Sequence, residues 1–320
     1  MRVRLVTGAA GFAGQHLLRA LLREDGPVVG WYRPGVPPPP TTPDGIRWQA
    51  VDLRDAAAVE AALSGVRPDE IYHLAGAANQ GASWQDTDVA LQLNALATHH
   101  LLRGVARHVP RVRTLVTTSA AVYAPSADAR DELSPLRPSS PYGVSKLAQE
   151  MAALRAAHDD GLDVVVVRPF NHIGPGQEAE YFAPSFARQL ARLEAGLEEP
   201  VLRVGNLEAA RDLSDVRDVV RAYTLLMRHA LPGEVYNVCR GTAFVIGDLL
   251  RDLVAMCRVD VRIETDPARL RPSDTPRLLG SHEKLTAATG WTPEVPLART
   301  LEDILDDQRR RHTRRNVPLA

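Results

Sequence analysis

A glycine-rich turn near the start of the numbering constrains the fold of this chain more than any other stretch. An apolar run of strand length, 3–7, precedes it, and an amphipathic run of helical length, 12–23, follows it. Between them the glycines form a GxxGxxG pattern. Glycines at such a junction permit a tight turn and let the backbone approach a pyrophosphate, which then lies at the N-terminus of the helix. The pattern therefore predicts a dinucleotide site at Gly8, Gly11, Phe12, Ala13 and Gly14.

Strand-like and helix-like runs then alternate through residue 168. The expected strands are 28–33, 46–51, 70–74, 114–119 and 162–168, and the expected helices are 56–63, 86–108 and 141–158. This alternation predicts an α/β protein with a doubly wound parallel sheet. The continuous valines of 164–167 are typical of a parallel strand buried on both faces.

The pattern changes after residue 168, where 169–176 reads as a loop. Helices are expected at 182–196, 215–229, 246–256, 282–288 and 297–309, and strands at 201–204 and 234–238. We predict a dinucleotide-binding domain of residues 1–168, which 213–240 rejoins through its strand. A smaller mixed α/β substrate-binding domain then comprises 169–212 and 241–320.

Residues that follow the predicted strands are candidates for the rest of the cofactor site. Arg33 stands where an NAD-specific site usually has an acidic residue, so it favours NADP(H) by pairing with a 2′-phosphate, while NAD(H) and a merely exposed charge stay open. Asp52, beside Leu53, suits either an adenine amine or a helix cap. Leu74, Ala75 and Gly76 are further candidates, because the small side chains that follow Leu74 let the backbone lie against the cofactor.

Two polar residues have apolar sequence neighbours, and these neighbours indicate the role of each residue. Asn94 lies inside the long predicted helix, where a buried amide needs partners, so we expect it to hold a helix irregularity or a water beside the cofactor. His73, at the end of a predicted strand, is expected to be structural rather than catalytic.

A catalytic set is indicated by Ser119, Tyr142 and Lys146. The spacing of four places Tyr142 and Lys146 on one face of a helix, where an ammonium is expected to ease ionisation of the phenol. Ser119 ends an apolar strand, at the edge where α/β proteins bind ligands. The YxxxK spacing alone also fits a surface helix, but the upstream glycine pattern favours catalysis by proton exchange.

Composition excludes several other classes of protein. The net charge of −1 predicts no general attraction to nucleic acid or to an anionic membrane. The two cysteines, Cys239 and Cys257, form no disulfide framework and no metal-ligand spacing, so we expect no metal. The run 164–167 is too short to span a bilayer, and no signal-peptide segment precedes residue 3, so we expect a cytoplasmic protein.

Taken together, these motifs resemble the extended short-chain dehydrogenase/reductases, the NAD-dependent epimerase/dehydratase superfamily. The matching motifs are TGAAGFAG at 7–14, HLAG at 73–76, Ser119, YxxxK at 142–146 and RPFN at 168–171. Within that superfamily, 171–177, 204–209, 211–212 and 266–274 look like the GDP-4-keto-6-deoxy-D-mannose reductases, whose close relatives are the GDP-mannose 4,6-dehydratases.

The resemblance implies a role for each candidate residue. Ser119 and Tyr142 would handle the proton, and Lys146 would hold the nicotinamide ribose. The diphosphate of a GDP-sugar would be bound by Asn171, Arg211 and Arg271, and Glu194 would pair with the guanine edge. Arg203 is a further arginine suited to a diphosphate, although all three arginines also fit an ordinary surface. The resemblance also implies a homodimer through helices 86–108 and 141–158, with Leu91, Leu102, Met151 and Leu154 as apolar candidates.

One departure from the superfamily narrows the reaction. Its dehydratases have an acidic residue just after the active Ser or Thr, but here Ala120 and Ala121 follow Ser119. Alanine cannot act as a general acid or base. This argues against dehydration and leaves hydride transfer and epimerisation open, since both use the same Ser, Tyr and Lys. On the resemblance we expect an NAD(P)H-dependent reductase of a GDP-4-keto-6-deoxyhexose. An NAD-dependent nucleotide-sugar 4-epimerase is the alternative, and a dehydratase or a non-catalytic dinucleotide sensor is disfavoured.

Overall fold

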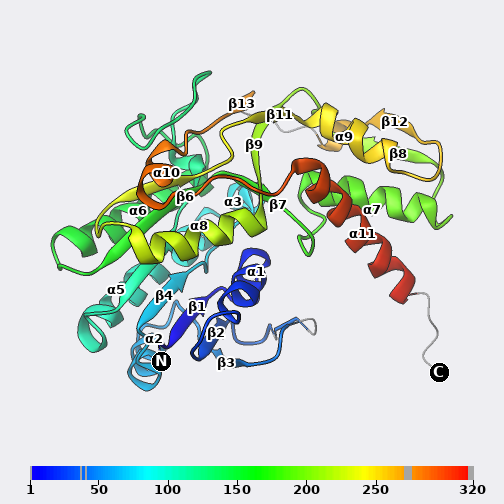
Figure 1. Ribbon diagram of the computed structural model, residues 1–320. Helices are drawn as coiled ribbons and strands as arrows, with labels where there is room; N and C mark the ends of the chain where they lie inside the picture. The colour runs from blue at the N-terminus through cyan, green and yellow to red at the C-terminus, as the bar shows by residue number, and fades with distance from the viewer. Residues whose placement is uncertain (1, 37, 40–41, 270–275, 316–320) are drawn as a thin grey trace, which may run out of the picture.

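The computed structural model describes residues 2–36, 38–39, 42–269 and 276–315, without the side chains of 312–315. Its centre is a parallel sheet of seven strands in the order β3-β2-β1-β4-β5-β6-β10 (Figure 1). The strands are β1 (Arg4–Thr7), β2 (Val28–Tyr32), β3 (Ile46–Ala50), β4 (Glu70–His73), β5 (Arg113–Thr117), β6 (Val164–Pro169) and β10 (Val235–Val238). The predicted α/β fold with a doubly wound parallel sheet is confirmed, and the strand expected to rejoin the sheet pairs with β6.

Helices cover both faces of this sheet because alternate strand residues point to opposite sides. On one face, Val6 and Val165 pack with α1 (Phe12–Leu21), α8 (Val216–His229) and α10 (Glu283–Thr289). On the other, Leu5 and Val164 pack with α2 (Ala56–Val66), α5 (Ala97–His108) and α6 (Pro141–His158). The bounds of α6 match the predicted helix because Ser140 caps it and Pro141 opens it.

The long helix predicted over 86–108 is divided by a change of helical geometry. It comprises α4 (Thr87–Leu91), a π-helical turn, η1 (Gln92–Leu96), and α5. Asn94 lies in the π turn, which confirms the expected helix irregularity. A short helix that was not predicted, α3 (Gln80–Gln85), precedes α4 and is capped by the side chain of Asn79.

The second unit lies beyond the carboxyl edge of the sheet (Figure 1). Its core joins α7 (Phe182–Glu194), α9 (Ile246–Ala255) and α11 (Leu297–Arg315). One small sheet contains β7 (Asn171–Ile173), β9 (Ala210–Asp215), β11 (Ala243–Val245) and β13 (Arg277–Leu278), and another pairs β8 (Val201–Val204) with β12 (Arg262–Thr265). The prediction of an uninterrupted loop at 169–176 is wrong, because β7 pairs with the distant β9. The domain boundaries at 168 and 241 stay a prediction.

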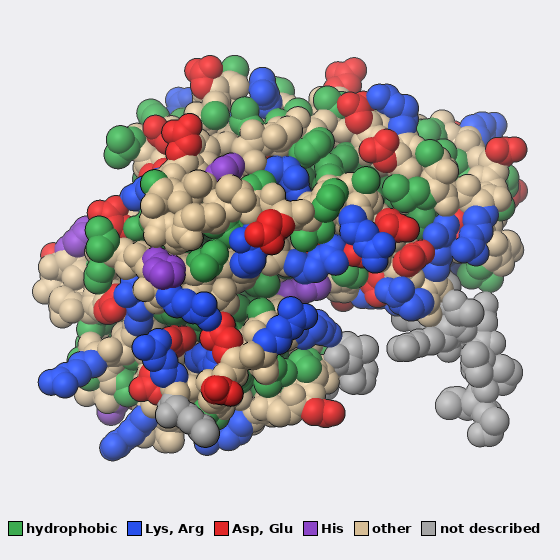
Figure 2. Space-filling view, in the orientation of Figure 1, with side chains coloured by type: hydrophobic (Ala, Val, Ile, Leu, Met, Phe, Trp, Pro, Cys, Tyr) green, Lys and Arg blue, Asp and Glu red, His purple; other side chains and the backbone are tan. Residues whose placement is uncertain are grey.

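On the face that Figure 2 shows, basic and acidic side chains are interspersed, and neither sign of charge forms a continuous patch. Within the described ranges, no helix is long and apolar enough to cross a membrane.

Candidate active site

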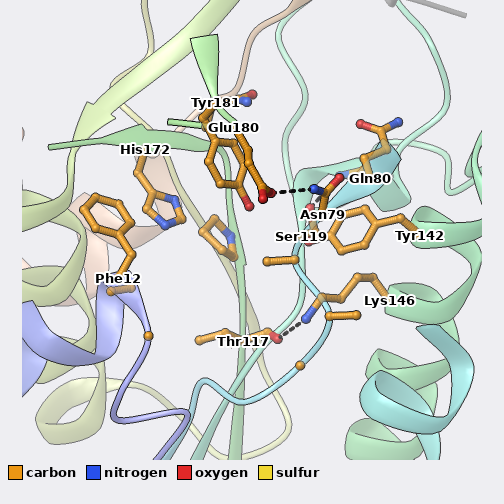
Figure 3. Close-up of a pocket in the computed structure, with 18 of the residues that line it drawn as sticks. Phe12, Asn79, Gln80, Thr117, Ser119, Tyr142, Lys146, His172, Glu180 and Tyr181 are labelled. Carbon is orange, nitrogen blue, oxygen red and sulfur yellow. Dashed lines mark hydrogen bonds between the residues drawn. The ribbon is translucent and has the colours of Figure 1, made fainter. Parts of the chain in front are cut away.

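A large cleft runs along the carboxyl edge of the main sheet and is closed on its far side by the second unit (Figure 3). One wall of the cleft is formed by the glycine-rich turn, by the first turns of α6, and by the segments that follow β2, β3, β4 and β5. Parts of β7, β9 and α7 line the other. The site therefore lies where ligands bind in open α/β sheets, outside the carboxyl ends of the strands.

The glycine-rich turn is packed too closely for side chains at two of its positions. Gly8 has a φ of +65°, and a Cβ there would lie 2.7 Å from the amide nitrogen of Ala75. A Cβ on Gly14 would lie 2.3 Å from the carbonyl oxygen of Gly8. Both contacts are shorter than atoms tolerate, so the turn and the segment after β4 form a backbone cradle suited to a pyrophosphate. The ring of Phe12 stacks on the ring of His172 across the cleft, with the two ring centroids 5.9 Å apart.

The predicted adenosine end of the cleft is lined by Arg33, Asp52 and Leu53. The carboxylate of Asp52 accepts two hydrogen bonds from the guanidinium of Arg54, at 3.0 and 2.7 Å, and these bonds lower its pKa. Asp52 does not cap the next helix, because Asp55 accepts the amide hydrogens of Ala57 and Ala58 at the start of α2. The side chain of Arg33 is exposed at the mouth of the cleft.

Ser119, Tyr142 and Lys146 come together at the centre of the cleft (Figure 3). Ser119 follows β5 and lines the cleft together with Tyr142, and its Oγ accepts from the amide of Ala121 at 3.1 Å. Tyr142 lies in the first turn of α6, where its amide donates to Oγ of Ser83 at 3.1 Å. Lys146 lies one turn later, with Nζ 6.0 Å from the centroid of the Tyr142 ring.

The sequence spacing leads us to expect that the Lys146 ammonium eases ionisation of the Tyr142 phenol, but the structure indicates otherwise. Burial raises the pKa of Tyr142 to about 12, and the neighbouring hydroxyl of Ser119 offsets this only in part. Burial lowers the pKa of Lys146 to about 7. Nζ of Lys146 donates to the carbonyl of Thr117 at 3.2 Å and to Oε1 of Gln149 at 2.8 Å, rather than to the phenol. Tyr142 thus keeps its proton at neutral pH, as a proton donor must.

His73 and Asn94 lie behind the cleft. His73 is fully buried between Thr7 and Thr98, with both ring nitrogens at 2.7 Å from a hydroxyl oxygen. Burial lowers its pKa to about 3, which fits the predicted structural role. The Asn94 amide holds the backbone N–H and C=O of Ala77 at 2.9 and 3.3 Å. Asn94 therefore shapes the backbone that faces the cleft without lining the cleft itself.

The structure places some of the predicted substrate-binding residues at the cleft and others away from it. Asn171 and Arg211 line the cleft. Arg203 is exposed on β8 and does not line it. Glu194 is also outside the lining, because its carboxylate is bound by the guanidinium of Arg309 at 2.8 and 2.7 Å and by the amide of Arg258 at 2.9 Å. These contacts correct the expected guanine contact of Glu194. The remaining candidate, Arg271, lies outside the described residues.

Several lining residues were not predicted from the sequence. The amide of Asn79 donates to the carboxylate of Glu180 at 2.9 Å, which joins the segment after β4 to the segment before α7 (Figure 3). Arg130 is buried at the cleft and donates to the carbonyls of Ala124, Ser126 and Leu279. Arg269 also lines the cleft. Asn79, Glu180 and Arg130 lie outside the helices and strands, and Arg269 ends a single 3-10 turn, Pro267–Arg269, so hydrophobic periodicity gives no signal for them.

Ala120 and Ala121 line the cleft beside Ser119 and bring no carboxyl group there. Among the described residues of the lining, the carboxylates are those of Asp52, Glu178 and Glu180. Asp52 lies at the adenosine end and is paired with Arg54. Glu180 belongs to the opposite wall, where it binds Asn79. A carboxyl group at the position used by dehydratases is therefore missing from the described lining.

The cradle and the Ser–Tyr–Lys set define a dinucleotide-dependent enzyme of the Rossmann type. Residues 4–239 match the NAD dependent epimerase/dehydratase family, and the chain belongs to that family.

Known relatives agree with this assignment. The chain is 37% identical over 306 residues to the GDP-6-deoxy-D-mannose reductase of Pseudomonas aeruginosa, covering 94% of this chain and 95% of the relative. The solved structure of RMD from Pseudomonas aeruginosa complexed with NADPH superposes with a TM-score of 0.84 at 34% identity, covering 97% of this chain and 100% of that one. The structure of Thermus thermophilus UDP-glucose 4-epimerase in complex with NAD superposes with a TM-score of 0.85 at 27% identity, and the match covers 96% of this chain and 99% of that one.

Proposed function

We propose that this protein is an NADPH-dependent reductase of the C4 keto group of a GDP-4-keto-6-deoxyhexose. The observation that carries the proposal is the site itself, in which a protonated Tyr142 shares the cleft with Ser119 and Lys146, and alanines stand at 120 and 121. That set can donate a proton to a carbonyl oxygen but offers no carboxyl group for the elimination of water. The similarity to a GDP-6-deoxy-D-mannose reductase over 94% of the chain supports the substrate class.

In the mechanism, each residue of the set has a separate task. A bound nicotinamide supplies the hydride. Tyr142 donates its proton to the oxygen at C4 as negative charge develops there. Ser119 hydrogen-bonds the same oxygen and so stabilises the charge. Lys146 offers the one ammonium of this set and orients the ribose of the nicotinamide nucleotide.

The two ends of the cleft supply the binding groups. Gly8, Gly11 and Gly14, with the backbone of 74–76, would hold the pyrophosphate of the cofactor. Arg33 would pair with the 2′-phosphate of NADPH. Arg211 and Asn171 would take the diphosphate of the sugar nucleotide on the opposite wall. Arg271 remains a candidate for the same role from sequence alone.

A panel of 4-keto sugars carried by GDP, UDP and dTDP, each with NADPH and with NADH, tests the proposal. We expect the fastest oxidation of NADPH with the GDP-linked substrate. Faster turnover of a UDP- or dTDP-linked sugar would contradict the assignment of the base.

The second candidate function is a nucleotide-sugar 4-epimerase, which the structural similarity to a UDP-glucose 4-epimerase favours. Both reactions use the same Ser, Tyr and Lys, so the cofactor distinguishes them. An epimerase regenerates its cofactor in each cycle and retains it, whereas a reductase must exchange it. Purified protein that carries tightly bound NAD, with no net consumption of NADPH, would support the epimerase.

The proposal extends to assembly and location. A shallow apolar depression is lined by Leu91, Ala95, Leu96 and other residues of η1, α5 and α6, and exposed Met151 lies on α6. These residues support a homodimer through the two helices. Leu102 and Leu154 pack into the protein's own core instead. Light scattering that gives the mass of a monomer at micromolar concentration would contradict the dimer. We also propose that the enzyme is cytoplasmic.

A further inference from the structure

Four buried side chains that the proposed mechanism does not use extend a hydrogen-bond chain from the catalytic lysine. Nζ of Lys146 donates to Oε1 of Gln149 at 2.8 Å, and Nε2 of Gln149 donates to Oγ1 of Thr98 at 2.9 Å. Thr98 then contacts Nε2 of His73 at 2.7 Å, and Nδ1 of His73 contacts Oγ1 of Thr7 at 2.7 Å. Lys146 is 5% exposed and the other four side chains are completely buried.

One direction of donation is consistent with every contact in this chain. A neutral imidazole has one donor and one acceptor, and burial keeps His73 neutral. Because Gln149 donates to Thr98, the Thr98 hydroxyl is free to donate to Nε2 of His73. Nδ1–H of His73 then donates to Thr7. The far end reaches the cofactor cradle, since Oγ1 of Thr7 also accepts from the amide of Ala75 at 3.2 Å.

Gln149 is the decisive member because Lys146 has no carboxylate partner among the described residues. The neighbouring Glu150 is bound by Arg168 and Thr118. Gln149 therefore supplies the one side-chain acceptor of Lys146 in the described structure, and the carbonyl of Thr117 supplies the other acceptor. Removing the Gln149 amide would leave a buried ammonium with a single partner, a costly arrangement.

We propose that Gln149 is a positioning residue for Lys146, and that the chain through Thr98 and His73 couples the lysine to the turn that holds the cofactor. The inference rests on the proposed function only in taking Lys146 to act on a bound nicotinamide nucleotide.

The groups facing Lys146 allow a test by pH. The titratable ones are Tyr142 on its own helix and His73 on β4. β5 contributes the neutral carbonyl of Thr117, and η1 contributes the neutral amide of Asn94 near Gly76. His73 is already neutral and Tyr142 stays protonated, so a loss of cofactor affinity between about pH 6 and pH 9 reports mainly on Lys146.

The main variant is Gln149→Glu, which keeps the shape and places a carboxylate beside Nζ. The chain can still be satisfied, because the Thr98 hydroxyl and the neutral His73 ring can both reverse their direction of donation. A carboxylate favours the charged lysine, so we expect the loss of NADPH affinity to move to higher pH by about one unit or more. Gln149→Met removes the acceptor, and should weaken NADPH binding by about tenfold and move the loss to lower pH.

The measurement is a fluorescence titration with NADPH, without any sugar, over this pH range. The matched control is Gln85→Glu, which adds the same charge at an exposed glutamine outside the cleft and should leave the profile unchanged. An unchanged pH profile in Gln149→Glu, with only a lower Tm, would overturn the positioning role. Gln149→Glu decides the question if Gln149→Met does not fold.

A double-mutant cycle tests the coupling. If the chain acts as a unit, Thr98→Val and Gln149→Met together should weaken NADPH binding little more than either alone. Additive losses would overturn the coupling to the cofactor turn. Failure of every sugar in the substrate panel, with the pH shift present, would reject the proposed substrate and leave the role of Gln149 standing.

Discussion

Glu150 and Arg168 form a bidentate ion pair in the interior, with guanidinium nitrogens 3.0 and 2.6 Å from the two carboxylate oxygens. Their side chains are 0% and 4% exposed. The pair ties α6, which carries Tyr142 and Lys146, to β6 at the edge of the cleft. Arg168 also donates to the hydroxyl of Tyr123 at 2.8 Å, so the network reaches the segment after Ser119.

Glu150→Ala is expected to destabilise the protein strongly, because it leaves the Arg168 charge buried and unpaired. The loss should be about 3–5 kcal/mol of unfolding free energy. Urea denaturation measures it. The matched control is Asp160→Ala, which breaks an exposed pair with Arg155 and should cause little measurable loss. Equal losses in the two variants would show that the buried pair is not a special support of α6.

Tyr142→Phe should lower kcat by roughly 10²–10⁴-fold, since it removes the positioned proton donor. Binding of NADPH, measured by fluorescence, should stay nearly unchanged because the cradle is formed by the backbone around Gly8 and Ala75 and not by the phenol hydroxyl. A kcat close to that of the unmodified protein would refute the assignment of Tyr142 as the donor.

Arg33→Ala should reduce the preference for NADPH over NADH. The guanidinium is exposed at the adenosine end of the cleft, where a 2′-phosphate would add a charge-assisted hydrogen bond. The ratio of kcat/KM for the two cofactors, in both proteins, measures the effect. An unchanged ratio would identify Arg33 as a surface charge only.

Arg211→Lys should raise KM for the sugar nucleotide by about tenfold or more and leave KM for the cofactor nearly unchanged. Lysine keeps the charge but lacks the planar fork that binds a diphosphate from one side. Because Arg211 lies on β9 between β11 and β13, a structural role is the alternative. In that case Tm would fall while KM of the folded protein stayed the same.

Much of the fold follows from local signals. The glycine pattern, the cap at Ser140 and the proline at 141 lie within a few residues of the elements they define. β7 was missed because a three-residue strand is defined by its pairing with β9, about forty residues along the chain, rather than by its own pattern.

The site was predicted less completely, for the same physical reason. The spacing of Tyr142 and Lys146 correctly places both at the cleft, but it does not reveal that Lys146 points to Gln149 and Thr117. Glu194 has the residue type expected of a guanine contact, yet Arg309, more than a hundred residues later, occupies its carboxylate. Partners from distant segments decide the chemistry of each group, and a local pattern does not contain them.

The central claim, hydride transfer to C4 without elimination, is tested most directly with NADPH deuterated at its transferable position. The protein is incubated with this cofactor and a GDP-4-keto-6-deoxyhexose, and the product is analysed by mass spectrometry and NMR. We predict one deuterium at C4 of the product for each NADPH consumed. Conversion of the sugar with no net loss of NADPH, or a product that carries no deuterium at C4, would contradict the assignment as a reductase.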